Sequence, residues 1–579
     1  MAGSTTWTQT AGPRTPEQVP PGGGSGIVTA PPPCLQVLRM PAPARSALAC
    51  LLALAAASPA LPAFAAERAP AVAEAPTLPA QLADFDAYVE NVRKSFNIPG
   101  IAVAIVQDDR IVLERGYGTR TVGGKPVDAH TMFAIASNTK AFTAAALNIL
   151  AEDGKLSLDD RVIDHLPWFQ MSDAYVTREM RIKDLLAHRS GLSLGAGDLL
   201  YWPTTDYTNM DVARRLRNVP LTGSFRERYA YDNILYGVAQ LVIEQASGMS
   251  YEQFLRTRIL QPLQMNETRF NFDTVKPGEN VATGYALADG KTLEPAPTLT
   301  WNNVSGAGGL YASAHDMTKW MRMQLAGGSY IDAAGKTQSL FQTKSQQAMW
   351  TMLTPMPVPK PAVPALQTAM PNFIGYGQGW MLSDYRGNRL VWHTGGWPGM
   401  VSRLTLVPDH KLGVIVLTSG EFGGAFNAIT LRALDAFLDA PKTDWNAAYG
   451  AALAASRGKT DDRWAALEAA RAKDSTPSLP PAGYAATYRD PWYGDVIVAQ
   501  EGDKLRMHFS HTKALTGTLT HWQHDTFIVR WDERWLNADA FVTFALTPEG
   551  KVREARMEAI SPNTDFSFDF QDLVLTPVK

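Results

Sequence analysis

The chain has 579 residues, of which 45% are hydrophobic and 19% charged, a composition typical of globular proteins. This length exceeds what one small hydrophobic core can organise, so we expect two folded domains. The formal net charge of −3 argues against a broadly basic surface, and no nucleic-acid partner is expected.

Residues 1–65 are interpreted as a leader that is not part of the folded protein. After a start rich in Gly, Pro, Ser and Thr, Met40 opens a segment with the basic residue Arg45, a Leu- and Ala-rich run, and the tripeptide Ala-Phe-Ala at 63–65. This order is typical of a secretory signal peptide with its cleavage site. We expect translation to start at Met40 and the mature protein to begin near Ala66, in the periplasm or outside the cell.

Two other interpretations of the leader fit its sequence less well. A membrane anchor is disfavoured because Pro59 and Pro62 interrupt an apolar run that is already short. A lipoprotein is disfavoured because Cys50 comes too early in that run. Since the other cysteine, Cys34, also lies in the leader, the mature chain is predicted to lack a disulfide, a thiol nucleophile and a cysteine metal site. It is also predicted to keep no stable membrane span.

The first folded domain is predicted over residues 80–440. Residues 100–121 read as a hairpin, with an apolar strand, a polar turn and an alternating strand. Three more strands are predicted near the end of the domain, at 388–397, 400–408 and 412–420. Helical patterns such as 233–260 lie between the two groups of strands. The chain is therefore expected to leave a sheet and return to it.

Within this domain, residues 354–364 carry too many prolines for a helix or a central strand and are predicted to form a surface loop.

The sequence pattern changes after residue 440. Residues 441–482 are predicted to be a linker, helical over 443–473 because that stretch is rich in alanine. From 483 to 579 apolar residues alternate between glycine- and proline-marked turns, which predicts a β-rich C-terminal domain.

The segment 134–150 places Ser137 three residues before Lys140, in the first turn of an expected helix. Residues with this spacing share one helix face. A serine hydroxyl is a weak nucleophile that needs a nearby base. A lysine whose pKa is lowered by burial can act as that base or as a proton relay. The pair is thus a candidate nucleophile and base; alternatively, Ser137 caps the helix and Lys140 is solvated.

Two downstream motifs extend this pattern. Tyr-Asp-Asn at 231–233 stands just before an expected helix, and His-Thr-Gly at 393–395 ends an expected strand. A Ser-x-x-Lys pair, a Tyr-x-Asn motif, and a basic residue followed by Thr-Gly form the three-part pattern of the penicillin-recognising serine hydrolases. Over roughly residues 80–440, the chain resembles the family that contains class C β-lactamases, D-alanyl-D-alanine carboxypeptidases, D-aminopeptidases and β-lactamase-like esterases.

The resemblance implies the fold class. It is α/β (α+β): a β-lactamase/transpeptidase-like domain with an antiparallel sheet flanked by helices. The C-terminal strands resemble the small β-rich domain of unknown function that is often appended to such hydrolases. That domain could shape substrate access or mediate association, and the sequence does not choose between these roles.

The resemblance also implies the roles of individual residues. Ser137 would attack a carbonyl carbon and form an acyl-enzyme, while Lys140 and Tyr231 would move its proton and then protonate the leaving group. Asn233 would hold an amide of the substrate. The backbone N–H groups of Ser137 and Gly396 would form the oxyanion hole. For two of these residues simpler roles remain open, since Tyr231 could be a packing aromatic and Asn233 a helix cap.

The substrate would lie against His393, Thr394 and Gly395. Glycines at 395 and 396 would let it lie close to the strand. His393 departs from the family's class C β-lactamases, which usually carry a lysine there to bind the carboxylate of the drug. Histidine is mostly neutral at pH 7. The departure therefore leaves acyl transfer intact and disfavours efficient β-lactam hydrolysis. Asp232 is a second departure, because it adds a negative charge between Tyr231 and Asn233.

The remaining histidines are assigned structural roles. His188 is expected to follow a helix and order a loop. The pairs at 508 and 511 and at 521 and 524 lie on predicted strands, where residues three apart point to opposite faces. A shared metal site is therefore not expected. No metal and no other cofactor is required by the predicted chemistry.

The sequence thus predicts an exported serine hydrolase that cleaves an amide or ester bond through a Ser137 acyl-enzyme. A D-amino-acid peptide, a β-lactam and a small ester all remain open as substrates, because selectivity resides in loops. A binding protein is the alternative: a penicillin or muropeptide sensor that acylates slowly and barely turns over. The intact nucleophile and proton relay favour the enzyme. The partner is a small molecule or short peptide, and the sequence leaves the oligomeric state open.

The export prediction can be tested by N-terminal sequencing of protein recovered outside the cytoplasm of an expressing bacterium. The expected first residue is near Ala66, because signal peptidase cleaves after the Ala-Phe-Ala tripeptide. Exported protein that still begins at residue 1 would contradict the prediction.

Overall fold

The computed structural model describes residues 78–578, so the leader, its predicted signal peptide and both cysteines lie outside the described residues. An eight-stranded antiparallel sheet forms the centre of the first domain. In the order in which they lie side by side, its strands are β10 (Thr354–Met356), β11 (Ile374–Tyr376), β12 (Met381–Tyr385), β13 (Asn388–Trp397), β14 (Met400–Val407), β15 (Leu412–Thr418), β1 (Gly100–Gln107) and β2 (Arg110–Gly118).

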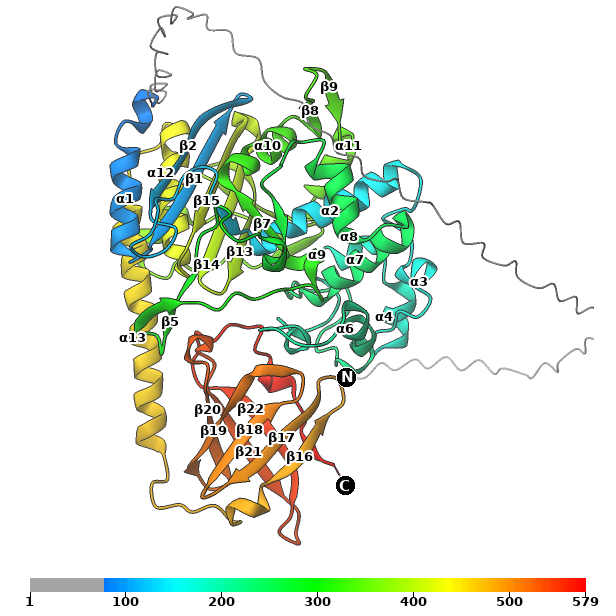
Figure 1. Cartoon of the computed structure of the whole chain (residues 1–579), viewed down its shortest axis with the longest axis vertical. Helices are drawn as coiled ribbons and strands as arrows, with labels where there is room; N and C mark the ends of the chain where they lie inside the picture. The colour runs from blue at the N-terminus through cyan, green and yellow to red at the C-terminus, as the bar shows by residue number, and fades with distance from the viewer. Residues whose placement is uncertain (1–77, 579) are drawn as a thin grey trace, which may run out of the picture. The chain divides into compact units, whose positions relative to one another are not determined.

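Both faces of this sheet are covered by helices (Figure 1). Along β1, Ile101 and Val103 pack into one core and Ala102 and Ala104 into the other. Strands buried on both faces carry continuous apolar runs, which explains the sequence of β1 and β15. The first core includes α1 (Phe85–Ser95) and α12 (Gly423–Phe437), and the second includes α2 (Thr139–Glu152) and α10 (Ala314–Leu325).

A helical region separates β2 from β10, and a small three-stranded sheet lies within it. The other helices of the region are α3 (Val162–His165), α4 (Ala174–Glu179), α5 (Ile182–Leu185), α6 (Asn209–Arg215), α7 (Ile234–Ser247), α8 (Tyr251–Leu255), α9 (Ser305–Gly308) and α11 (Thr343–Met349). The small sheet consists of β3 (Met132–Ala134), β7 (Leu310–Ser313) and β4 (Arg269–Phe270). Two hairpins complete the region: β5 (Tyr285–Ala288) with β6 (Thr292–Pro295), and β8 (Ser329–Ile331) with β9 (Thr337–Ser339).

The chain leaves the central sheet after β2 and returns to it at β10, as expected. The prediction of a loop over 354–364 is wrong at its start, because Thr354–Met356 forms β10. Pro355 is tolerated there because β10 is the edge strand of the sheet, where one side of the backbone needs no partner. The remainder runs as loop into a 3₁₀ turn at Pro364–Ala369.

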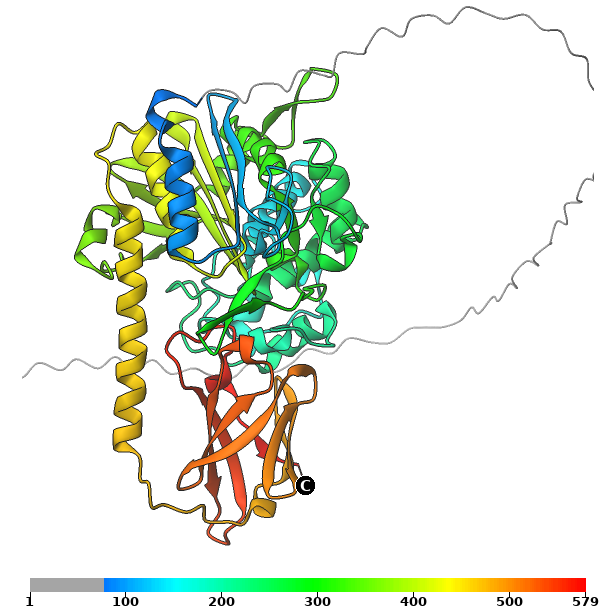
Figure 2. The ribbon, with the colours of Figure 1, turned by 60° about the vertical axis from the view of Figure 1, so that its left-hand side comes forward.

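The long helix α13 (Trp445–Ala470) connects the first domain to the C-terminal strands. These strands form a second eight-stranded sheet, shown in orange and red in Figure 2. Its order is β22 (Val552–Ala559), β21 (Ala540–Leu546), β20 (Thr526–Trp531), β19 (Thr512–Gln523), β18 (Lys504–Phe509), β17 (Gly494–Glu501), β16 (Ala486–Asp490) and β23 (Thr576–Pro577). A bridge between Ala555 and Leu575 joins its two edges into a nearly closed barrel. Within residues 78–578, no helix has both the length and the apolar character needed to cross a membrane.

A buried ion-pair cluster holds the loops that follow α5. The carboxylate of Asp184 is fully buried and accepts hydrogen bonds from the guanidinium groups of Arg189 and Arg226 at 2.9 and 2.6 Å. Removing one partner of such a buried pair is strongly destabilising because it leaves the other charge uncompensated. The cluster therefore fixes the chain on both sides of His188 and shortly before Tyr231.

Candidate active site

Ser137 is presented by a sharp turn between a strand and a helix. The chain leaves β3, passes Ala136 with a φ of 46°, and enters α2 through a short 3₁₀ turn at Ala136–Asn138. A left-handed conformation is uncommon for a residue other than glycine and is maintained only where the surroundings enforce it. Here Ala136 is fully buried. The turn leaves Ser137 itself 9% exposed.

The structure brings Ser137, Lys140 and Tyr231 together, although Tyr231 lies 94 residues away in the chain. Ser137 Oγ lies 3.1 Å from Lys140 Nζ and 2.8 Å from Tyr231 Oη. The alternatives that Ser137 caps the helix and that Tyr231 only packs are therefore wrong. No side chain at the start of the 3₁₀ turn or of α2 accepts a capping hydrogen bond, and the phenol contacts the serine.

Lys140 is 0% exposed, because every residue of α2 from 139 to 150 is buried. Its Nζ contacts three oxygens: Ser137 Oγ, Asn233 Oδ1 at 2.6 Å and the carbonyl of Ala307 at 3.0 Å. Burial lowers the pKa of Lys140 to about 7, against the opposing effect of nearby carboxylates. The alternative of a solvated lysine is wrong, and the amine can lose its proton near neutral pH.

Asn233 links this lysine to a buried carboxylate. Its Oδ1 accepts from Lys140, and its Nδ2 donates to Asp198 Oδ2 at 2.9 Å. Asn233 is the N-cap residue of α7, as the helix-cap interpretation expected, but its side chain makes no capping hydrogen bond and binds Lys140 and Asp198 instead. Burial raises the pKa of Asp198 to about 7. Asp198 is not indicated by the sequence, because the surrounding Gly-Asp-Leu-Leu carries no motif and only the fold brings it to Asn233.

Asp232 points away from the serine. Its side chain is fully buried, with Oδ2 at 3.4 Å from Ser190 Oγ and 3.8 Å from His188 Nδ1. The backbone N–H of Asp232 donates to His188 Nδ1 at 3.2 Å, so this imidazole nitrogen carries no proton. His188 therefore orders the 231–233 segment, and its ring lies 4.3 Å from that of Tyr231. Burial and the Lys140 ammonium both hold the pKa of His188 well below its usual range.

His393 is buried, and both ring nitrogens have partners. Nδ1 lies 2.6 Å from the carbonyl of Thr394, so Nδ1 donates a proton, and Nε2 accepts from the Tyr376 hydroxyl at 2.8 Å. Burial lowers the pKa of His393 to about 3. The imidazole is thus neutral near pH 7, and neither nitrogen is free to bind a carboxylate.

The two glycines at the end of β13 differ in the space around them. A Cβ on Gly395 would lie 2.1 Å from the carbonyl of Ile135, so this glycine lets β13 pack against the turn that presents Ser137. A Cβ on Gly396 would meet nothing within 4 Å, and Gly396 and Thr394 line the open cleft. The predicted substrate contact at Gly395 stays a prediction beside this packing role. The oxyanion hole at Ser137 and Gly396 stays a prediction.

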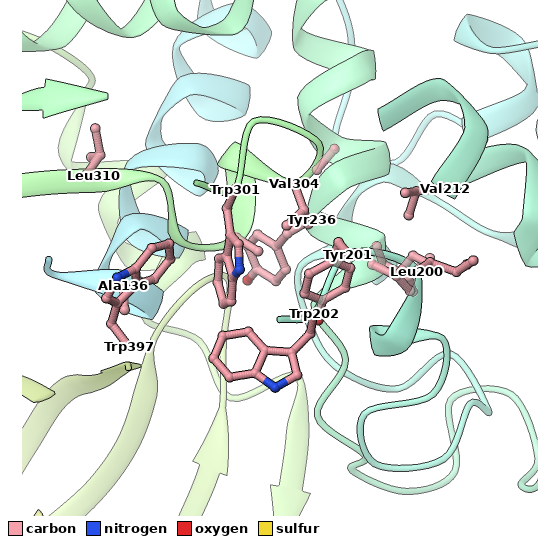
Figure 3. Close-up of a cluster of buried hydrophobic side chains, with 14 of the residues drawn as sticks. Ala136, Leu200, Tyr201, Trp202, Val212, Tyr236, Trp301, Val304, Leu310 and Trp397 are labelled. Carbon is pink, nitrogen blue, oxygen red and sulfur yellow. The ribbon is translucent and has the colours of Figure 1, made fainter. Parts of the chain in front are cut away.

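The cleft over Ser137 has a volume of about 340 Å³ and a largely aromatic wall. Trp301 lies at the centre of a buried cluster, with ring centres 5.5 Å from Trp202 and 4.8 Å from Trp397 (Figure 3). Among the described residues that line the cleft there is neither lysine nor arginine. The lining residues are Ser137, Leu194, Trp202, Tyr229, Tyr231, Asn233, Trp301, Met381, Trp392, His393, Thr394, Gly396, Asp565, Phe566 and Ser567.

Three of these lining residues belong to the C-terminal domain. Phe566 packs edge-on against Tyr231 with ring centres 5.7 Å apart, and Asp565 is exposed at the cleft. The barrel therefore contributes to the wall of the candidate site. The sequence left this role open beside association and did not identify the residues, because nothing in the 565–567 segment distinguishes it from an ordinary turn.

This arrangement can activate a serine. When Lys140 is neutral, it donates to Asn233 and Ala307 and can accept the hydroxyl proton of Ser137. Burial holds the pKa of Tyr231 well above its usual range, so its phenol stays protonated and donates to Ser137 Oγ. Lys140 is thus suited to be the general base, and Tyr231 to donate a proton to a leaving group.

The other histidines lie elsewhere. In the C-terminal domain, His511 pairs with Asp206 at 2.6 Å, and His521 Nε2 contacts the carbonyl of His524 at 2.9 Å. Among residues 78–578, no group of three or more His, Cys, Asp or Glu side chains is placed to hold a metal ion.

Comparisons with known proteins match both domains. The Beta-lactamase family model covers residues 85–438, and a model described as a domain of unknown function covers residues 470–577. The unguisins hydrolase of Aspergillus violaceofuscus is 27% identical over 74% of this chain and 79% of its own. Protein flp of Staphylococcus aureus is 29% identical over 58% of this chain and 62% of its own.

Two solved structures share the fold. The octameric penicillin-binding protein homologue from Pyrococcus abyssi aligns with a TM-score of 0.53 at 22% identity, covering 85% of this chain and 99% of that one. The D-amino acid amidase from Ochrobactrum anthropi in complex with L-phenylalanine aligns with a TM-score of 0.51 at 21% identity, covering 62% and 99%. The predicted fold class and family resemblance are confirmed.

The lowered pKa of Lys140 predicts how the reactivity of Ser137 depends on pH. The rate of labelling by a fluorophosphonate, followed by intact mass, should rise with pH and level off above about 7, because only neutral Lys140 can accept the serine proton. Lys140→Met should slow labelling about a hundredfold or more at every pH. The exposed Lys155→Met serves as control. A rate that is flat from pH 5 to 9 would contradict the assignment.

Proposed function

The chain belongs to the Beta-lactamase family, and we propose that it is a serine hydrolase that cleaves an amide or ester bond through a Ser137 acyl-enzyme. One observation carries the proposal: Ser137 Oγ lies within hydrogen-bond distance of both Lys140 and Tyr231. A bond forms between Oγ and the substrate carbonyl carbon while the serine proton passes to Lys140. The bond to the leaving group then breaks as Tyr231 delivers a proton to it, and the proton held by Lys140 passes on to restore the Tyr231 phenol. Water releases the acyl group by the reverse sequence.

The charge of the cleft favours substrates without a free carboxylate next to the scissile bond. The described lining residues supply no lysine or arginine, His393 is neutral with both nitrogens occupied, and Asp565 adds an acid. A carboxylate placed there loses water without gaining a cation, which is costly. β-Lactams and carboxypeptidase substrates carry such a carboxylate. We therefore favour a neutral or cationic amide or ester with an apolar group against the aromatic wall.

The compared proteins are compatible with this substrate class. One relative is named an unguisins hydrolase and one structural neighbour a D-amino acid amidase. A D-amino-acid amide is accordingly a suitable first probe. Export of the protein, with cleavage near Ala66, is part of the same proposal and is supported by the signal-peptide pattern at 40–65.

A matched pair of substrates tests the proposal. D-phenylalanyl-D-alaninamide and D-phenylalanyl-D-alanine differ only in whether the leaving group ends in a carboxamide or a carboxylate. We expect kcat/KM to be at least about tenfold higher for the carboxamide, because the cleft offers no cation to the carboxylate. Benzylpenicillin, which also carries a carboxylate, should be hydrolysed slowly.

Control variants test whether Ser137 is the nucleophile, independently of which substrate is preferred. Ser137→Ala should abolish turnover of both dipeptides, whereas the exposed Ser172→Ala should change nothing. Turnover that survives in Ser137→Ala would identify a different nucleophile. Faster cleavage of the free acid would contradict the proposed substrate class. A stable adduct on Ser137 with no turnover of any probe would instead favour the penicillin or muropeptide sensor.

A further inference from the structure

Ser567 of the C-terminal domain reaches into the hydrogen-bond network of the candidate active site. Its side chain is buried, with 5% exposure, and its Oγ donates to Asp198 Oδ2 at 2.8 Å. Asp198 is itself 0% exposed. This contact joins two residues that are 369 positions apart in the chain and belong to different domains.

The network continues from Asp198 to the nucleophile. Asn233 Nδ2 donates to the same Oδ2 at 2.9 Å, and Asn233 Oδ1 accepts from Lys140 Nζ at 2.6 Å. Lys140 in turn contacts Ser137 Oγ at 3.1 Å. Because an amide presents its oxygen and its NH₂ in opposite directions, a fixed carboxylate on one side of Asn233 holds its oxygen towards the lysine. Four contacts therefore connect Ser567 to Ser137.

The backbone around Asp198 is held by the same segment of the barrel. The carboxylate of Asp569 accepts from the backbone N–H groups of Gly197 and Leu199, at 2.6 and 3.2 Å. Those residues flank Asp198 on both sides. Two residues of the C-terminal domain thus fix both the main chain and the carboxylate of Asp198.

We propose that Ser567 is a positioning residue by which the C-terminal domain completes the active site, holding Lys140 beside Ser137 through Asp198 and Asn233. The inference rests on the proposed function. It gives the barrel a part in the chemistry itself, separate from the part that Phe566 plays in the wall of the cleft.

The electrostatics give this role a measurable signature. The negative charge of Asp198 raises the pKa of Lys140, and the hydrogen bond from Ser567 lowers the pKa of Asp198. Loss of the Ser567 hydroxyl should leave Asp198 neutral up to higher pH, and Lys140 should then deprotonate at lower pH. The other titratable groups that act on this pair are Asp232, His188, His393, Tyr201, Asp565 and Asp569.

The test compares Ser567→Ala with Ser510→Ala, an exposed serine of the same domain, in the full-length protein. With D-phenylalanyl-D-alaninamide, Ser567→Ala should lower kcat/KM about tenfold, and the acid limb of its pH profile should move to lower pH. Ser510→Ala should match the unmodified protein in both respects. A Ser567→Ala enzyme with an unchanged acid limb would overturn the proposal, even if its activity fell, because a purely structural effect leaves the pH profile in place.

A second variant keeps the proposal testable should Ser567→Ala not fold, as judged by its thermal unfolding. Asp198→Asn keeps the shape of the side chain and removes the charge, so its acid limb should also move to lower pH. An unshifted limb in Asp198→Asn would likewise overturn the proposal. Failure of the proposed function looks different, because turnover would then persist in Ser137→Ala.

Discussion

The burial of one amine, that of Lys140, is the constraint on which the rest of the site depends. Taking an ammonium out of water disfavours its charge, which is why its pKa falls to about 7. An exposed lysine three residues after Ser137 would stay protonated and could not accept the serine proton. The helix that carries Lys140 is enclosed on all sides, and three oxygens satisfy the nitrogen where water would otherwise bind.

The two domains contribute to this enclosure in different ways. The first domain supplies the helix α2 that carries Lys140, the loop of Tyr231 and the strand β13, whose Gly395 allows close packing against the turn at Ala136. The C-terminal barrel supplies Ser567 and its neighbours, which stabilise the carboxylate behind Asn233. The role proposed for Lys140 requires carboxylates whose charge opposes the effect of burial without keeping the amine protonated, and both domains contribute to the position of these carboxylates.

Much of this could be predicted from the sequence, because local patterns encode it. The i, i+3 spacing of Ser137 and Lys140 and the apolar runs of β1 and β15 each specify structure within a few residues. Asp198 and Ser567 could not be predicted, since neither lies in a motif and their contact depends on how a distant domain docks. The strand β10 could not be predicted for a related reason. Proline is tolerated in an edge strand but not in a central one, and whether the strand at Pro355 lies at an edge depends on how the whole sheet is assembled.

The protonation state of Lys140 is the most direct test of this account, and it can be measured without any substrate. An NMR titration of the protein labelled with ¹³C at the lysine ε-carbon would follow each amine with pH, and the Lys140→Met variant would assign the resonance. The account predicts one lysine that titrates near pH 7 and is absent from the variant. A spectrum in which every lysine titrates above pH 9 would show that Lys140 stays charged and would contradict its role as the base.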